Sequence, residues 1–244
     1  MYEDVLSDFD NTIIECDPRL LNFYKRSFPG YREKFVSLGT ITNDDEEFKK
    51  IDYIIYAGSL GRYYRKNIKD FKNNSFLKVD EKKLEEMKRK LSIYKKKYKI
   101  GLSWKSFSDK FATDKSLNLK DFKNIFSLTD CDIFNLQYGM VEDEINSFNN
   151  TAKNKLLSID GLDLKNDFEG IASLLKSLDV FISVSNSTAH LAGALGVKTI
   201  LIKPKNFAVF HYWNQKTDNT PWYPSVKLID KKKLLNDSKF LKIF

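Results

Sequence analysis

The chain has 244 residues, of which 42% are hydrophobic and 14% aromatic, so it can form one large or two small domains and is too apolar to be disordered. Its two cysteines exclude a disulfide framework, and the lack of a long apolar run excludes a membrane-spanning helix. The first ten residues, MYEDVLSDFD, contain no apolar signal region, and we expect a cytoplasmic protein.

The 41 basic and 33 acidic residues give a net charge of +8, and most of the excess is lysine. The lysines gather in residues 82–90, 95–97 and 231–233, and such runs are typical of solvated helix faces and tails. A nucleic-acid surface favours arginine interleaved with aromatic residues. We therefore expect no nucleic-acid partner, whereas a small anionic substrate suits a positive field.

The first part of the chain alternates short apolar runs with helical segments. The pattern predicts strands at residues 11–16 and 52–57, and helices at residues 18–28 and 59–65. The polar residues 66–79 indicate a linker, and we place a domain boundary near residue 78. The predicted domains are therefore residues 1–78 and 79–244.

The second part is more regular and predicts an α/β domain with a parallel sheet. A capping box from Asn166 to Glu169 is expected to open a helix that carries Ile171, Leu174 and Leu175 on one face. The other predicted helices cover residues 80–97, 120–128 and 187–195, and the predicted strands cover residues 99–104, 132–138, 156–160, 180–184 and 198–203.

The most informative segment is VFISVSNSTAHLAGALG, which runs from Val180 to Gly196. A buried strand ends here and a helix begins at once, so the free N–H groups and the positive end of the helix dipole lie at the carboxyl edge of the sheet. Such a helix start binds phosphate. The alternative is that the serine and asparagine residues only cap the helix, and the residues alone favour neither reading.

The segment SNSTAHLAGALG resembles the phosphate-binding segment of GT-B glycosyltransferases, and of the heptosyltransferase-like family 9 in particular, including the relatives that are fused to tetratricopeptide repeats. Six further segments fit the same pattern in order, and they are ECDPRLLNFYKRSFPG, GSLGRYYR, IGLSWKS, FNLQYG, IDGLDLKNDFEGIASLLKSLD and NTPWYPSVKLI. The resemblance implies a complete C-terminal Rossmann-like domain with a parallel sheet, and a partial N-terminal Rossmann-like domain.

The resemblance also implies a nucleotide-sugar donor site, with a glycan or a protein as the acceptor. Lys105 is expected to pair with a donor phosphate, and Gln137 and Tyr138 to contact the base or the ribose. Asp160 and Asp163 lie near these, and Trp222 and Tyr223 either stack on a ring or pack the domain. No metal or other cofactor is expected, because the helix start and basic side chains replace a metal. The full set of donor-binding residues is Ser103, Trp104, Lys105, Gln137, Tyr138, Asn186, Ser187, Thr188 and His190.

One part of the family pattern has no counterpart here, namely the opening strand and its Gly-x-Gly-Asp segment. The resemblance therefore implies an N-terminally truncated first domain, since about 78 residues are too few for a complete one. The missing half belongs to an upstream part of the gene or to another chain, or else the protein is an inactive remnant that binds a nucleotide-sugar or a partner. We name no catalytic base.

A rival motif lies at the N-terminus. Asp8-Phe9-Asp10-Asn11-Thr12 resembles the first motif of the haloacid dehalogenase superfamily, in which the first aspartate is the nucleophile and the second the acid/base of phosphoryl transfer. That motif follows a buried strand, whereas only Val5 and Leu6 precede it here. This resemblance gives an alternative function, namely a phosphatase that uses Asp8 and Asp10.

Overall fold

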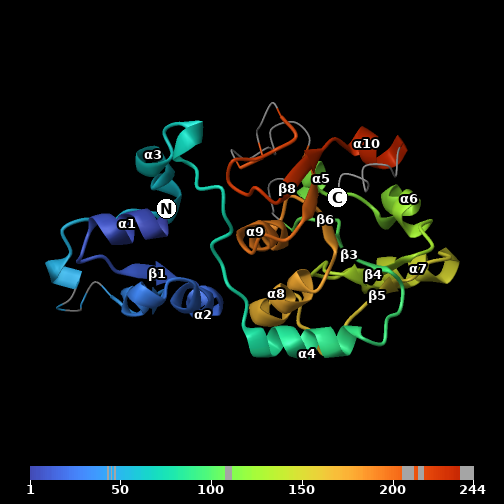
Figure 1. The fold of residues 1–244 in the computed structure, drawn as a ribbon, viewed down its shortest axis with the longest axis horizontal. Helices are drawn as coiled ribbons and strands as arrows, with labels where there is room; N and C mark the ends of the chain where they lie inside the picture. The colour runs from blue at the N-terminus through green and yellow to red at the C-terminus, as the bar shows by residue number, and fades with distance from the viewer. Residues whose placement is uncertain are drawn as a thin grey trace. The chain divides into compact units, whose positions relative to one another are not determined.

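The structure is a computed structural model that describes residues 1–42, 44, 46, 48–107, 112–204, 212–213 and 217–236. The chain divides into two compact units, Met1–Lys72 and Asn73–Phe244 (Figure 1). The division lies within the polar residues 66–79, at residue 72 where the sequence suggests 78. Among the described helices, none has the length and apolar character needed to cross a membrane.

The second unit contains a six-stranded sheet in which every neighbouring pair of strands is parallel. The order is β5-β4-β3-β6-β7-β8, so the chain moves outward from β3 to β5 and then returns to the other side of β3. This doubly wound order forms a crevice where the direction reverses, between β3 and β6. The strands are β3 (Tyr98–Ser103), β4 (Cys131–Asn135), β5 (Leu156–Leu157), β6 (Val180–Val184), β7 (Thr199–Ile202) and β8 (Val226–Ile229).

Helices cover both faces of this sheet, which is why every residue of β4, β6 and β7 is buried. One face packs against η5 (Leu119–Phe122), α6 (Lys123–Phe126), α7 (Glu142–Thr151) and α10 (Lys231–Asn236) in a continuous apolar core. The other face carries α4 (Glu81–Leu91), α8 (Phe168–Lys176) and α9 (Ser187–Ala194), which contact one another in sequence (Figure 1). The short helix α5 (Ala112–Lys115) lies between β3 and η5 in the chain.

Helix α9 lies close to its neighbours because its residues are small. A Cβ atom added at Gly193 would lie 2.5 Å from Cγ of Tyr223, so the Tyr223 ring rests directly on the helix backbone. Asn186 caps the first turn, and Gly196 leaves the helix with a φ of +71°, a conformation that favours glycine. The predicted helix at residues 187–195 and its glycine stop are therefore confirmed.

The first unit is built around a two-stranded parallel sheet, β1 (Ile14–Cys16) and β2 (Phe35–Ser37). Its small core consists of buried Leu6, Ile14 and Phe35, with tyrosine and phenylalanine rings packed around them. The remaining elements are α1 (Tyr2–Asp8), α2 (Pro18–Ser27), η1 (Pro29–Lys34), η2 (Phe48–Lys50), η3 (Ala57–Ser59), α3 (Gly61–Tyr64) and η4 (Ile68–Asp70).

Several sequence predictions of local structure are wrong. Residues 52–57 form no strand, since residues 52–56 are exposed without regular structure and Ala57 begins η3. The predicted capping box is also wrong, because Asp167 caps α8 by accepting from the N–H of Gly170. The helix expected at residues 80–97 ends at Leu91, and the pattern did not reveal α1, β2, α7, β8 or α10.

Candidate functional site

The carboxyl ends of β3 and β6 meet at the reversal point of the sheet, and most of the predicted donor-binding residues follow these two strands. These six residues are Ser103, Trp104 and Lys105 at the end of β3, and Asn186, Ser187 and Thr188 after β6. Ser187 is exposed, and the other five are buried or half-buried.

Asn186 joins the two strand ends. Its Oδ1 accepts from the N–H of Ala189 at 3.0 Å and caps α9, while its Nδ2 donates to Ser103 Oγ at 2.7 Å and to the Lys105 carbonyl at 3.3 Å. Within the described residues, the N–H groups of Ser187 and Thr188 have no hydrogen-bond partner. The first turn of α9 therefore presents two backbone donors at the crevice.

The Gln137 side chain holds the residues at the end of β3 in place through hydrogen bonds. Its Oε1 accepts from Ser103 Oγ at 3.0 Å, from the Trp104 N–H at 2.8 Å and from the Lys105 N–H at 2.6 Å. Its Nε2 donates to the carbonyl of Tyr138, and the side chain is 1% exposed. The Gln137 carboxamide thus holds the backbone that presents Lys105.

Lys105 is held by a residue that the sequence interpretation missed. Its Nζ lies 2.6 Å from Oε2 of Glu144, and the same carboxylate accepts from the indole of Trp104 and the N–H of Leu119, both at 3.1 Å. Burial acts to raise the pKa of Glu144, but these three donors outweigh it and hold the pKa below its ordinary value. Any anion at Lys105 therefore shares the ammonium with Glu144. The only sequence signal was the acidic run Glu142-Asp143-Glu144 after β4.

The lowered pKa of Glu144 predicts a contribution to acid stability. A carboxyl group with a depressed folded pKa stabilises the protein fully above its ordinary pKa of 4.5, and this stability is lost as the pH falls through the lower folded pKa. We expect Glu144→Gln to lower the midpoint of urea unfolding at pH 7 and to reduce the loss of stability below pH 4.5. Urea titrations from pH 3 to 7 measure both effects. Parallel curves for the two proteins would contradict the assignment.

His190 lies in the first turn of α9 within a group of rings. Its Nδ1 is 3.1 Å from the hydroxyl of Tyr223, and its ring lies 4.7 Å from Trp213 and 5.0 Å from Tyr212, centroid to centroid. Trp213 is fully buried and donates to Ser185 Oγ, which anchors the group to the end of β6. Trp222 contacts Tyr212 edge to face. Within the described residues, these rings form a wall beside the start of α9.

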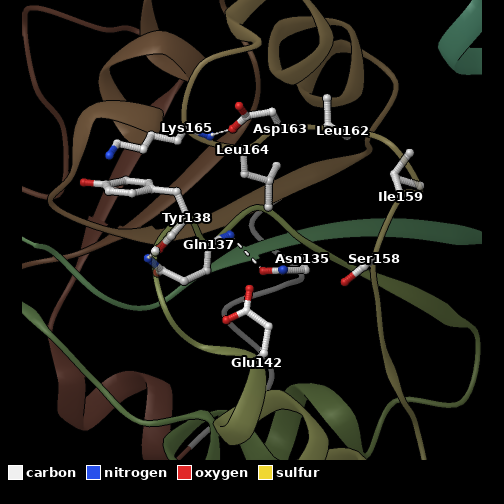
Figure 2. Close-up of a pocket in the computed structure, with 11 residues that line it drawn as sticks. Asn135, Gln137, Tyr138, Glu142, Ser158, Ile159, Leu162, Asp163, Leu164 and Lys165 are labelled. Atoms are coloured by element: carbon white, nitrogen blue, oxygen red, sulfur yellow. Dashed lines mark hydrogen bonds between the residues drawn. The ribbon is translucent and has the colours of Figure 1, made fainter.

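A pocket of about 340 Å³ lies at the carboxyl ends of β4 and β5 (Figure 2). Polar groups of Asn135, Glu142 and Ser158 gather around its middle, and Leu162 and Leu164 lie above them (Figure 2). Gln137 and Tyr138 form one side, so the pocket adjoins the residue that organises the end of β3. The remaining lining residues are Gly139, Ile159, Asp163 and Lys165.

Asp163 lines this pocket and Asp160 does not, although the sequence places both near Gln137 and Tyr138. Asp163 lies on its rim, but its carboxylate already accepts from the N–H groups of Lys165 and Asn166 and from the Asn166 side chain, which hold its pKa below the ordinary value. Asp160 is exposed and does not line the pocket. The hydrogen bonds of the Asp163 carboxylate therefore stabilise the turn at residues 163–166.

The phosphatase motif does not have the structure that its chemistry needs. Asp8 is the last residue of helix α1, and its carboxylate accepts from the hydroxyl of Tyr64, while Asp10 is exposed in the following turn. An aspartate nucleophile of that superfamily follows a buried strand, so this alternative is overturned. Among the described residues, no three histidine, cysteine, aspartate or glutamate side chains form a cluster suited to a metal ion.

Comparisons with known proteins add a relative and two structural neighbours, whereas no protein-family model matches the chain. Protein FlbA of Caulobacter vibrioides is 28% identical over 228 residues, which are 88% of this chain and 37% of FlbA. The glycosyl transferase family 9 structure from Veillonella parvula matches 65% of this chain with a TM-score of 0.50 and 13% identity. The E. coli ADP-heptose LPS heptosyltransferase II matches 71% with a TM-score of 0.50 and 10% identity.

The chain spans only part of each of these proteins, namely 44% of the Veillonella chain and 53% of the E. coli chain. Each match covers more of the chain than the first unit contains, so it extends into the second unit, which holds the doubly wound parallel sheet. The protein thus has the GT-B fold of the family 9 glycosyltransferases that its sequence resembles.

Proposed function

We propose that the second unit binds a nucleoside-diphosphate sugar, and that the protein acts in the transfer of this sugar to a glycan or protein acceptor. The carrying observation is the start of α9, where Ser187 is exposed and two N–H groups without partners in the described residues point away from the helix at the reversal point of the sheet. A diphosphate is the ligand best suited to these donors, because it gains both hydrogen bonds and the helix dipole.

The pocket at the carboxyl ends of β4 and β5 suits the nucleoside part of the donor. Its volume of about 340 Å³ is within the range of small-molecule sites. The carboxylate of Glu142 can accept from ribose hydroxyls, and Leu162 and Leu164 offer apolar surface to a base. Gln137 lines this pocket and bonds to the segment that Asn186 joins to α9, so one hydrogen-bonded path links the two subsites.

The charge distribution supports an anionic ligand for the second unit. Residues 73–244 contain twenty-nine lysine and arginine residues against twenty aspartate and glutamate residues, whereas residues 1–72 contain twelve against thirteen. The positive charge of the protein therefore belongs to the unit that carries α9. Such a field attracts phosphorylated ligands at ordinary ionic strength.

The proposed chemistry breaks the bond between the anomeric carbon and the diphosphate oxygen and forms a bond from that carbon to an acceptor oxygen. Negative charge grows on the departing diphosphate, and the α9 amides together with Lys105 stabilise that charge as fixed donors. The acceptor hydroxyl loses its proton to a general base, for which we assign no residue. A metal ion is not required by this arrangement of donors.

Nucleotide binding is the first test of the proposal. Thermal unfolding with UDP, ADP, GDP and CMP at increasing concentration is expected to show stabilisation by at least one nucleoside diphosphate. A ligand at a hundred times its Kd stabilises the folded state by about 2.7 kcal/mol. If none of the four shifts the unfolding midpoint at millimolar concentration, the donor site is not where we place it.

Ser187 allows a sharper test, because it is exposed at the first position of α9. An aspartate here is compatible with the helix dipole and leaves the fold intact, but it repels a bound diphosphate. Two unit charges about 5 Å apart at an effective dielectric of 20 repel by about 3 kcal/mol, so Ser187→Asp is expected to weaken nucleotide binding at least about 100-fold. Isothermal titration calorimetry measures this change.

The control for that variant is Ser187→Asn, because asparagine has nearly the same shape as aspartate but carries no charge. We expect it to bind the nucleotide within about threefold of the unchanged protein, because it adds no charge beside the diphosphate. Equal affinities for the Asp and Asn variants would place the diphosphate elsewhere.

The alternative is a donor-binding protein without transferase activity, and the small two-stranded sheet of the first unit favours it. It predicts the same nucleotide binding and the same effect of Ser187→Asp. Release of nucleoside diphosphate from a bound nucleotide-sugar separates the two functions, because only a transferase turns the donor over in the presence of an acceptor.

A further inference from the structure

The first unit exposes an apolar segment that its sequence marks as a strand. Residues 51–56 read Ile-Asp-Tyr-Ile-Ile-Tyr, rich in the β-branched and aromatic residues of strands. In the structure Tyr53 is 92% exposed, Tyr56 is 85% exposed and Ile54 is 69% exposed. Single exposed apolar side chains are common, but a contiguous run of this kind marks an interaction surface.

The backbone of this segment is also unpaired. Within the described part of the chain, no hydrogen bond joins residues 52–55 to any other residue. A row of free N–H and C=O groups beside apolar side chains is a template for a further strand. The segment therefore offers both the hydrogen bonds and the apolar contacts of a sheet edge.

We propose that residues 52–56 pair with the same residues of a second copy of this chain, as an antiparallel β-ribbon on a two-fold axis. Opposite residues of such a ribbon share a face, so the axis must pass through a residue and not between two residues. With the axis at Ile54, this residue faces its own counterpart and Tyr53 faces the partner's Ile55. Aromatic and β-branched side chains are favoured as such cross-strand pairs.

The charges of the chain favour a second copy as the occupant. In this register the single charged residue of the segment, Asp52, faces the partner's Tyr56 and no like charge is opposed. Residues 1–72 are nearly neutral overall, whereas residues 73–244 carry the positive excess. Contact through the first unit thus joins two copies by the part of the chain that repels itself least.

Light scattering after size exclusion, from 1 to 100 µM protein, measures the association. We expect a mass of twice 28.5 kDa for the unchanged protein. Ile54→Lys is expected to give the monomer mass across this range, with a dimer Kd at least about 30-fold higher, because it places two ammonium groups on the axis. The matched control is Ile93→Lys in the second unit, where Ile93 is 70% exposed, and this variant is expected to remain a dimer.

A cysteine at the axis tests the register directly. Opposite residues of antiparallel strands have Cα atoms about 4.5–5.5 Å apart, within the range of a disulfide, so Ile54→Cys is expected to form a covalent dimer under an oxidant such as diamide, which takes up the two thiol hydrogens. Ile93→Cys is expected to stay uncrosslinked, and the native Cys16 and Cys131 are buried. A monomeric unchanged protein at 100 µM, or a dimer that Ile54→Lys leaves intact, would overturn the proposal, whether the segment binds another protein or none. Neither result bears on the donor site.

Discussion

Replacing Gln137 with alanine is expected to lower the free energy of unfolding of the second unit by about 3–5 kcal/mol. The cost has two parts, both set by the 1% exposure of this side chain. The N–H groups of Trp104 and Lys105 lose their acceptor, and each buried unpaired group costs about 1–3 kcal/mol. The space left by the carboxamide adds a cavity. Urea unfolding followed by tryptophan fluorescence and circular dichroism measures the change.

Gln137→Met is the matched control for this prediction. It keeps the length and nearly the volume of the side chain but removes the acceptor, so it isolates the hydrogen bonds from the cavity. We expect it to remain destabilised by about 2–3 kcal/mol. A Met variant as stable as the unchanged protein would mean that the three bonds to Oε1 do not hold the end of β3. Both variants are also expected to weaken nucleotide binding, because Lys105 is presented by that backbone.

The second unit was more predictable from its sequence than the first, and the reason is physical. Strands buried on both faces read as continuous apolar runs, such as Val180–Val184, which is followed at once by a helix with its own start and stop residues. Asn186 and Gly196 mark both ends of α9 in a way that a single sequence reveals. The pattern gave no prediction for β2 and β8, although they are as long as β1 and β7, which it did predict, so length does not decide which strands a single sequence reveals.

The error at residues 52–57 has the opposite cause. Their composition is that of a buried strand, but composition cannot supply the neighbour that buries it, and no other part of the described chain does so. The capping box failed for a smaller reason. Asn166 and Asp167 are both good caps, and the choice depends on Asp163, whose carboxylate already accepts from Asn166 and so draws this residue into the preceding turn.

The candidate site was predicted as a set of positions but not as a network. The sequence placed Lys105, Gln137 and Asn186 at the ends of three different strands, and the fold brings those ends together. Gln137 was expected to contact a ligand, and its carboxamide makes its hydrogen bonds to Ser103 Oγ and to backbone groups after β3 and β4. Glu144 escaped notice, because pairing with Lys105 depends on how α7 docks after β4 and leaves no spacing signal.

Replacing Asn186 with alanine is expected to cost about 2–4 kcal/mol of stability and most of the nucleotide affinity. The variant removes the cap of α9, which contributes about 0.5–2 kcal/mol, and it also removes both bonds from Nδ2 to the end of β3. For a unit of this size the unfolding midpoint is expected to fall by roughly 5–15 °C. Differential scanning calorimetry measures the shift.

Asn186→Asp separates the two roles of the side chain. Aspartate retains the oxygen that accepts from Ala189, so the cap survives, but it cannot donate to Ser103 or to the Lys105 carbonyl. We expect a loss of about 1–2 kcal/mol, roughly half that of the alanine variant. If Asp and Ala cost the same, the cap is irrelevant and the bridge to β3 carries the whole effect. If Asp costs nothing, the bridge does not hold β3 and β6 together, and the start of α9 is positioned by the packing of its small residues against Tyr223 alone.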